Sequence, residues 1–196
     1  MPQSPTLPPS PSSSPPRRPL PESNLPPSLT HASLPLPTPS LTLDFRIAVD
    51  LNPLLPVGTH PGPFGQRNWI SFSGGTFAAT WATGTVVSGG QDSQLVIPSD
   101  LSTAVETAYL LQTNDEPPAH IAVRTRGWRS GPREVMERLF DPERASTVAP
   151  NEYKFHLSVS LETGDPRYSA LLNTGLWVGS GARLGRAVVY DAYRVV

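Results

Sequence analysis

The strict alternation of apolar and polar side chains in several short segments constrains this chain most. In residues 153–162, Tyr, Phe, Leu, Val and Leu alternate with Lys, His, Ser, Ser and Glu. Residues 41–50 alternate in the same way, with Leu, Leu, Phe, Ile and Val on one face. A period of two is typical of a β-strand with one buried face. The period alone leaves open which face would point into a closed barrel.

Similar short segments follow along the chain, separated by stretches rich in Gly, Pro, Asn and Asp. This succession predicts an all-β fold, either an antiparallel barrel or a sandwich. The expected strands are 41–50, 68–73, 76–80, 83–87, 94–97, 103–112, 119–126, 153–162, 175–178 and 187–195.

One short helix is predicted after residue 130. Ser130 is a candidate N-cap, Pro132 suits the first turn, and Glu134 lies near the positive end of the helix dipole. Apolar residues at 135, 136, 139 and 140 form one stripe before Asp141-Pro142 ends the helix. In a β protein, such a helix commonly covers a barrel end or a sheet edge.

Residues 74–96 break the strand pattern with two glycine pairs and a polar run, Gln-Asp-Ser-Gln at 91–94. A glycine pair in strand-like sequence predicts a tight turn, a bulge or a close backbone approach. We interpret this stretch as a hairpin at the barrel wall that places Asp92 and Gln94 near a cavity. The alternative is that Asp92 only closes an Asx turn.

The first 40 residues differ in composition from the rest, because they hold 14 of the 25 prolines and no aromatic residue. Such a segment cannot bury enough apolar surface to fold, so we predict a disordered tail with polyproline II character. Residues 41–196 are then a single β-barrel domain. The Pro-Pro-Arg-Arg-Pro element of the tail is also compatible with docking to an SH3-type groove.

Composition also excludes several classes of function. The formal net charge of −1 gives no general attraction to nucleic acid or anionic membrane, and the absence of cysteine excludes disulfides and thiolate sites. The chain has neither a long apolar run nor a secretory signal, so we expect a cytoplasmic protein without a membrane partner. The four histidines are not spaced as metal ligands, and no nucleotide or nucleophile-elbow motif is present, so neither metal nor cofactor is predicted.

Polar and charged residues near the ends of the predicted strands are the candidates for a site. A cluster of such groups would carry out general acid–base chemistry or bind a polar ligand. They are Arg67, Asp92, Gln94, His120, Arg124, His156, Glu162, Asn173 and Arg183.

Several short motifs, taken in order and spacing, resemble the uncharacterised protein family 0311 of small bacterial and fungal proteins. The resemblance covers residues 41–196 and implies an antiparallel, calycin-like β-barrel with a cavity. Its motifs are 65–67 (GQR), 73–77 (SGGTF), Gly84, 89–96 (GGQDSQLV), Tyr109, 162–168 (ETGDPRY), 172–173 (LN), 178–183 (VGSGAR), Tyr190 and Tyr193.

For most of this family the resemblance implies no known activity. Fungal members are associated with cofactor-free ring closure of polyketide-type intermediates, including hydroalkoxylation, the addition of a hydroxyl group across an alkene. The sequence departs from the family pattern at His156, where an arginine is usual, and at Ser93, where a bulkier residue is usual. Both departures affect the shape of the pocket and therefore the substrate.

The first functional hypothesis is a cofactor-independent cyclase of secondary metabolism that acts on a polyketide-type or prenylated aromatic small molecule. Asp92 and Glu162 are the expected carboxyl groups and His156 the expected base. The expected substrate-binding residues hold phenolate or carbonyl oxygens, or supply hydrogen bonds and a stacking wall. They are Arg67, Gln94, Tyr109, Arg124, Asn173 and Trp177.

Two further hypotheses stay open. The first is a non-catalytic carrier, and the residues that line the barrel interior would distinguish it from a cyclase. A carrier of an apolar metabolite would lack convergent acids, whereas two carboxyl groups, or one with His156, would indicate a catalyst. The third hypothesis is an interaction protein acting through its proline-rich tail. Long antiparallel strands are also compatible with a homo-oligomer.

Overall fold

The computed structural model describes residues 25–29, 36–141 and 143–196. The chain divides into two units, residues 1–38 and residues 39–196, and the second holds every strand described. In the first, Pro27–Leu29 forms a 3-10 turn (η2) without buried residues. Most of the predicted disordered tail, including the Pro-Pro-Arg-Arg-Pro element, lies outside the described residues, so its disorder stays a prediction.

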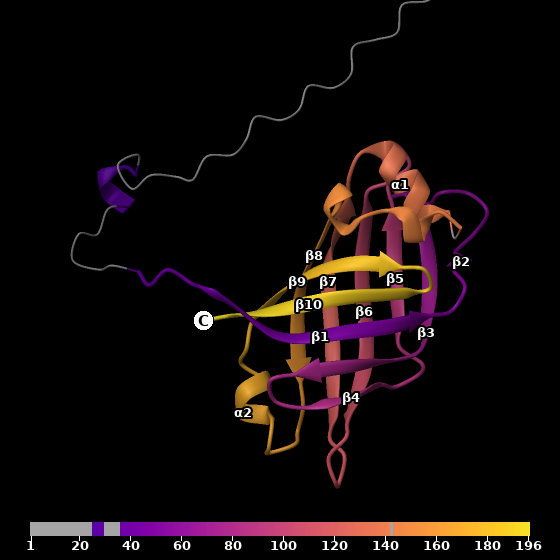
Figure 1. Cartoon of the computed structure of the whole chain (residues 1–196). Coiled ribbons are helices and arrows are strands. Elements are labelled where there is room, and N and C mark those ends of the chain that lie inside the picture. The colour runs from indigo at the N-terminus through magenta and orange to yellow at the C-terminus, as the bar shows by residue number, and fades with distance from the viewer. Residues whose placement is uncertain (1–24, 30–35, 142) are drawn as a thin grey trace, which may run out of the picture. The chain divides into compact units, whose positions relative to one another are not determined.

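The second unit is built from one antiparallel sheet (Figure 1). Its strands are β1 (Leu41–Leu51), β2 (Leu55–Pro56), β3 (Gln66–Ala79), β4 (Thr83–Val86), β5 (Gln91–Val96), β6 (Thr103–Thr113), β7 (His120–Ser130), β8 (Lys154–Glu162), β9 (Trp177–Leu184) and β10 (Ala187–Val195).

The sheet closes on itself because β1 pairs with β10 on one side and with β3 on the other. Strands β4 and β5 follow each other in one position of the ring, between β3 and β6, and the short β2 lies in line with β1 against β3. The result is a closed barrel with eight strand positions. The predicted all-β antiparallel barrel is therefore confirmed, and the sandwich alternative is not what the chain forms.

Strand β3 continues without a break through the glycine pair at 74–75, although its pairing with β1 shifts register beside Gly74. The two strands predicted at 68–73 and 76–80 are one continuous strand of 14 residues, whose first half pairs with β5 and whose second half pairs with β4. A Cβ atom on Gly75 would lie only 2.1 Å from the Ala48 carbonyl oxygen of β1. The glycine pair thus allows a close backbone approach, one of the three predicted alternatives.

Two other glycine-rich segments differ from their predictions. The hairpin predicted within residues 74–96 is formed by β3 and β4, but the polar run 91–94 lies outside it, in β5, after the turn at Gly89 (φ +108°). Asp92 therefore sits in the middle of a strand and does not close an Asx turn. The segment 179–181, beyond the end of the strand predicted at 175–178, lies within β9, and the turn to β10 comes later, at Gly185.

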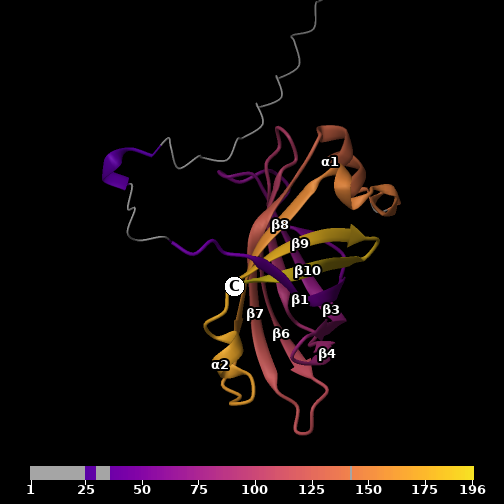
Figure 2. The same ribbon diagram turned by 60° about the vertical axis from the view of Figure 1, so that its left-hand side comes forward.

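Helix α1 (Arg133–Phe140) confirms the predicted helix and covers one end of the barrel (Figures 1 and 2). Its N-cap is Pro132 and not Ser130. Two 3-10 turns follow, η3 (Ala145–Thr147) and η4 (Pro150–Glu152). A second short helix, α2 (Ser169–Leu172), lies toward the other end and was not predicted. No helix in the described part of the chain is long and apolar enough to cross a membrane.

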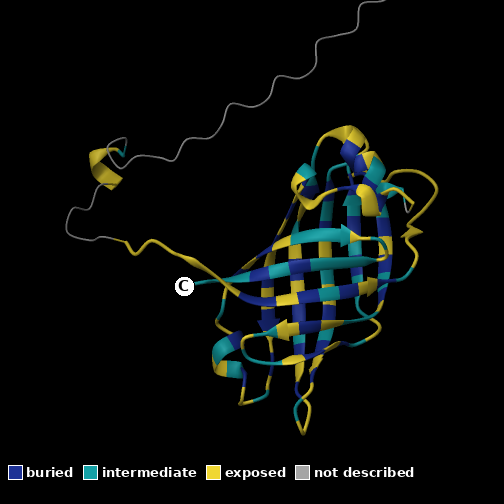
Figure 3. Cartoon of the chain, viewed as in Figure 1, coloured by how far each residue is buried: buried dark blue, intermediate teal, exposed yellow. Residues whose placement is uncertain are grey.

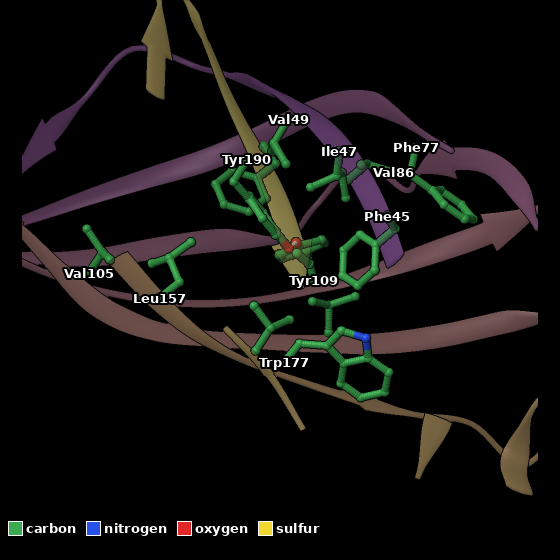
Figure 4. Close-up of a cluster of buried hydrophobic side chains, with 14 of the residues drawn as sticks. Phe45, Ile47, Val49, Phe77, Val86, Val105, Tyr109, Leu157, Trp177 and Tyr190 are labelled. Atoms are coloured by element: carbon green, nitrogen blue, oxygen red, sulfur yellow. Dashed lines mark hydrogen bonds between the residues drawn. The ribbon is translucent and has the colours of Figure 1, made fainter. Parts of the chain in front are cut away.

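The apolar faces of the strands point into the barrel, which answers the question left open by the alternation. In β8, Phe155, Leu157, Val159 and Leu161 are buried, and the residues between them are exposed (Figure 3). Aromatic side chains from separate strands meet in this core, including Phe45, Tyr109, Trp177 and Tyr190 (Figure 4). The interior is thus a packed apolar core, and the polar faces lie outside.

Strand β1 departs from its predicted alternation at a β-bulge between Leu43 and Phe45. The bulge buries Asp44 and leaves Leu41 and Leu43 exposed, although the sequence pattern placed both leucines on the apolar face. The Asp44 carboxylate accepts hydrogen bonds from Trp177 Nε1 at 2.7 Å and from the Thr80 hydroxyl. The bulge therefore supplies the acceptor that a fully buried indole requires.

We expect the change Asp44→Ala to lower the free energy of unfolding by about 1–3 kcal/mol, because it leaves the buried Trp177 Nε1 without an acceptor. Urea unfolding followed by tryptophan fluorescence measures this loss. The matched control is Asp50→Ala, which removes an exposed carboxylate from the same strand. An equal effect of the two changes would contradict the role given to Asp44.

Candidate functional site

Polar side chains interrupt the apolar core and line a small cavity inside the barrel. The cavity measures about 30 Å³, which is room for about two water molecules. Its lining residues are Val49, Leu51, Phe72, Asp92, Gln94, Val105, Thr107, Tyr109, Thr125, Arg129, Phe155, Leu157, Val188 and Tyr190.

Asp92 is the acidic residue of this cavity, and β5 explains its position. Residues of β5 alternate between partly exposed and buried, so Asp92, Gln94 and Val96 point inward. Asp92 Oδ2 accepts a hydrogen bond from Gln94 Nε2 at 2.8 Å, and Oδ1 accepts one from the backbone N–H of Glu106 on β6 at 3.1 Å. One carboxylate oxygen is therefore held by a side chain of the same strand, and the other by the backbone of the neighbouring strand β6.

Burial controls the acidity of Asp92, whose side chain lies in an otherwise apolar interior. Loss of solvent raises its pKa from 3.8 to about 6, while the hydrogen bonds from Gln94 and Glu106 oppose the rise. The carboxyl group consequently changes its protonation state close to neutral pH. A group of this kind can both accept and release a proton under physiological conditions.

Gln94 is a partner suited to both protonation states of Asp92. Its amide group donates to the carboxylate through Nε2 in the present arrangement. Rotation of the amide by half a turn would present Oε1, an acceptor for the O–H of a protonated carboxyl group. The pair can therefore keep its hydrogen bond when the proton is gained or lost.

Tyr109 and Tyr190 contribute a second polar pair to the cavity, since their hydroxyl groups hydrogen-bond to each other. Burial raises the pKa of Tyr109 well above its ordinary value, and burial likewise raises the pKa of Tyr190. Both phenols are therefore neutral at physiological pH. One hydroxyl donates within the pair, and the hydrogen of the other remains available for an acceptor.

Arg129 is the cationic residue of the cavity and was not among the predicted site residues. Its side chain is 1% exposed and its guanidinium lies 5.1 Å from the centre of the Phe140 ring of α1. Burial, followed by the charge of Arg183, lowers the pKa of Arg129 to about 10, so the group stays protonated at neutral pH. Continuing the alternation of β7 beyond its predicted end at Arg126 would have placed residue 129 inward.

A second, wider cavity of about 380 Å³ lies at the barrel end beside α1. It shares Leu51 and Gln94 with the interior cavity, so the two spaces meet at these side chains. The loop after β1, the end of α1 and the turn between β9 and β10 form its walls, and Arg183 and Arg186 give it positive charge. We call this space the mouth cavity.

Two larger hollows lie on the outer wall of the barrel. One of about 680 Å³ is lined by outward side chains, including Trp128 and His156, and another of about 720 Å³ includes Trp69 and Arg124. Neither contains a buried acid or base. The interior and mouth cavities are smaller but contain the titratable groups that burial perturbs, so we take them as the candidate site.

The structure brings together only some of the predicted site residues. Asp92, Gln94 and Tyr109 line the interior cavity. Trp177 is fully buried in the core, and its Nε1–H donates a hydrogen bond to the Asp44 carboxylate. Arg183 lines the mouth cavity. The remaining predicted site residues lie outside the interior and mouth cavities: Arg67, His120, Arg124, His156, Glu162 and Asn173.

These outer residues have other surroundings. Arg67 donates to the Ser93 carbonyl oxygen at 3.1 Å, and Asn173 bonds the backbone of Thr163 through both amide atoms. Arg124, His156 and Glu162 are exposed on β7 and β8. Among the described residues, no cluster of His, Asp and Glu side chains suited to a metal ion is found.

The model of the family described as "Protein of unknown function (DUF3237)" matches residues 39–195. The chain belongs to this family. A UPF0311 protein from Rhodopseudomonas palustris is 33% identical over 132 residues, which cover 67% of this chain and 82% of the relative. A UPF0311 protein from Clostridium acetobutylicum is 30% identical over 131 residues, covering 67% and 78%. These matches confirm the resemblance found in the motifs.

Solved structures have the same barrel. The crystal structure of the R. palustris protein aligns with a TM-score of 0.71 at 29% identity, covering 82% of this chain and 99% of that one. A "beta-barrel like protein" from Acinetobacter baumannii aligns with a TM-score of 0.68 at 34% identity, covering 83% and 99%. An enzyme from Penicillium herquei aligns with a TM-score of 0.58 at 19% identity, covering 85% and 100%, and so shares the fold.

The raised pKa of Asp92 predicts a pH-dependent effect of the change Asp92→Asn. Because the folded state holds the proton more tightly than the unfolded state, the carboxyl group stabilises the fold fully below pH 4, and this contribution disappears as the pH rises through about 6. The amide does not titrate. Asp92→Asn should therefore gain stability relative to the wild type above pH 6, by up to about 3 kcal/mol.

Urea unfolding of both proteins between pH 4 and pH 8 measures this difference. Other titrating groups are common to the two proteins, so the difference isolates Asp92. Asp50→Asn, on the exposed face of β1, serves as the control and should show no such trend. A stability difference that is constant across this pH range would show that the pKa of Asp92 is not raised.

Proposed function

We propose that the barrel is a cofactor-independent cyclase that closes an oxygen heterocycle on a small polyketide-type or prenylated aromatic molecule by intramolecular hydroalkoxylation. The observation that carries this proposal is Asp92, a buried acid whose pKa of about 6 suits proton transfer at neutral pH. The fold shared with a fungal enzyme is compatible with this activity and does not identify it.

The sizes of the two cavities suggest how a substrate would bind. The interior cavity of about 30 Å³ admits only a few atoms, whereas the mouth cavity of about 380 Å³ can take the body of a small aromatic molecule. Since Gln94 and Leu51 border both spaces, a substrate held in the mouth would extend its reacting oxygen past them toward Asp92. Holding the chain in this folded arrangement would itself lower the barrier to ring closure.

The proposed reaction balances without any added reactant. The Asp92 carboxylate removes the proton from the substrate hydroxyl, and the oxygen forms a bond to one alkene carbon. The electron pair of the alkene then takes the proton back from the Asp92 carboxyl group, forming the new C–H bond. One O–H bond and one π bond are lost, one C–O and one C–H bond are gained, and no atom is oxidised or reduced overall.

Of the three predicted catalytic residues, this proposal uses only Asp92. Glu162 and His156 are exposed on β8 and do not line the interior or mouth cavity. A single carboxyl group is sufficient because the same proton is removed and returned. Gln94 would preserve the hydrogen bond to Asp92 through both steps.

A non-catalytic carrier is the second candidate, and one observation favours it. Asp92 is the single acidic side chain lining the interior cavity, and most other lining residues are apolar. A carrier would bind its ligand with no requirement for proton transfer. The effect of Asp92→Asn on turnover and on binding therefore separates the two functions.

We expect the wild-type protein to accelerate the ring closure of 2′-hydroxychalcone, a phenol positioned to add across a conjugated alkene, and to favour one enantiomer of the product. Asp92→Asn should reduce the enzymatic rate by about 10²–10⁴-fold, the usual contribution of a general acid–base group, with little change in the dissociation constant. Chiral chromatography and fluorescence titration measure the two quantities.

Glu162→Gln provides the matched control, because it neutralises an exposed carboxylate on the outer wall and should leave the rate unchanged. Binding of the probe by the wild type without turnover or enantiomeric excess would support the carrier. Full activity of Asp92→Asn would remove Asp92 from the mechanism.

A further inference from the structure

Arg129 is a buried cation that the fold leaves without a partner. Its side chain is 1% exposed, and its Nε has no hydrogen-bond partner among the described residues. Within that same part of the chain, its guanidinium joins in no ion pair and donates no hydrogen bond, although the negative charge of Asp92 favours its protonated form. The Nε–H donor of this buried side chain thus remains unused.

Burying an unpaired guanidinium group is energetically unfavourable unless another group accepts its hydrogen bonds. Burying a charge without a counter-ion is strongly unfavourable, and buried arginines in structural roles are paired or hydrogen-bonded. Among the charged groups around Arg129, Arg183 carries a like charge that adds to this cost, and Asp92 carries an opposite charge that offsets part of it. The Phe140 ring, 5.1 Å from the guanidinium carbon, contributes a favourable cation–π contact but accepts none of its N–H groups in a conventional hydrogen bond.

The position of Arg129 identifies where a partner would lie. Residues 121, 123 and 125 of β7 are buried inside the barrel, and Arg129 continues the same inward row, next to Phe155 of β8 in register. It lines the interior cavity together with Asp92, Gln94 and Thr125. The unused donor therefore borders the space that would receive the inner end of a ligand.

We propose that Arg129 binds an anionic oxygen of the ligand, a carboxylate, phenolate or enolate, inside the barrel. Arg183 of the mouth cavity adds positive potential on the path to this position. The planar guanidinium, with its paired donors, matches such a group. The proposal deepens the function proposed above by naming the chemical class of its ligand, and it holds equally for a carrier.

The mouth cavity specifies the other part of the ligand. Its apolar lining consists of Leu51, Pro53, Leu54, Ile70 and Phe140. A conjugated or aromatic body in the mouth cavity, with one anionic oxygen extending into the interior cavity, satisfies both features. With its charge at Arg129, such a ligand would present the neighbouring carbon and oxygen atoms to Asp92, which lines the same cavity.

The test uses 2-naphthoate and its neutral counterpart 2-naphthamide as probes, with binding to the full-length protein measured by isothermal titration calorimetry at pH 7.5. The wild type should bind 2-naphthoate saturably and more tightly than the amide. Arg129→Met, which keeps a flexible unbranched side chain but removes the guanidinium charge, should weaken 2-naphthoate binding about tenfold to a hundredfold. Binding of 2-naphthamide should change little.

Arg124→Met is the matched control, since Arg124 lies on the same strand but points outward. It should bind both probes as the wild type does. Arg129→Gln provides a second neutral variant with remaining hydrogen-bonding capacity and should also lose the preference for the anion. Equal affinity of the wild type for both probes, absence of 2-naphthoate binding, or unchanged anion preference in Arg129→Met would overturn the proposal.

A second measurement separates ligand binding from a structural role. If Arg129 is kept for a ligand, the ligand-free Arg129→Met protein should melt at a higher temperature than the wild type, because an unpaired buried charge has been replaced by an apolar side chain. A lower melting temperature would show that Arg129 holds the fold together and would contradict the proposal.

The variant Asp92→Asn makes the failure of this proposal distinguishable from the failure of the cyclase proposal. It should retain the preference for 2-naphthoate over 2-naphthamide, because Arg129 is unchanged. If 2′-hydroxychalcone is not turned over but 2-naphthoate binding depends on Arg129, the anion site stands without the cyclase. If turnover depends on Asp92 but the preference for 2-naphthoate does not depend on Arg129, the cyclase proposal stands without the anion site.

Discussion

Closure of the barrel through β1 is the constraint on which the rest of the structure depends. Hydrogen bonding of β1 to β10 and to β3 fixes the register of the ring and sends alternate side chains into a common interior. With eight strand positions, such an interior is just wide enough for side chains to fill. The apolar faces do fill most of it, so any chemistry inside the barrel is confined to the small region where polar side chains interrupt the packing.

Desolvation gives this region its properties. The same burial that stabilises the apolar core moves the pKa of Asp92 up to about 6 and lowers that of Arg129 to about 10. The pKa of Asp92 thereby comes close to neutral pH, where the group can transfer a proton. Arg129 remains a cation, and its loss of solvent strengthens its attraction for an anion. The mouth cavity beside α1 connects this region to larger ligands at the barrel end through Gln94 and Leu51.

Much of the fold could be predicted from period and motif, because alternation runs through long strands such as β7 and β8 and the family motifs span the barrel. The errors arise where the backbone departs from a simple period. The bulge before Phe45 turns Asp44 inward, and Gly75 carries β3 onward where a break was expected. For the site, Asp92 and Gln94 stood out as polar residues in buried sequence. Arg129 was missed because β7 extends beyond its predicted end, and the outer positions of His156 and Glu162 depend on closure, which period alone does not determine.

The separation of Asp92 from Arg129 is the feature that most favours a functional role over a structural one. Two opposite charges in one small interior would ordinarily form a buried ion pair, which would lower the pKa of the acid and satisfy the guanidinium. No such pair is present among the described residues, and Asp92 is held instead by Gln94 and the backbone of Glu106. The charge of Arg129 still opposes part of the rise in the pKa of Asp92, but no hydrogen bond joins the two side chains, so both remain available to a third group. A cavity that keeps an acid near neutrality and a cation unpaired is arranged for a ligand that brings a negative oxygen and a transferable proton.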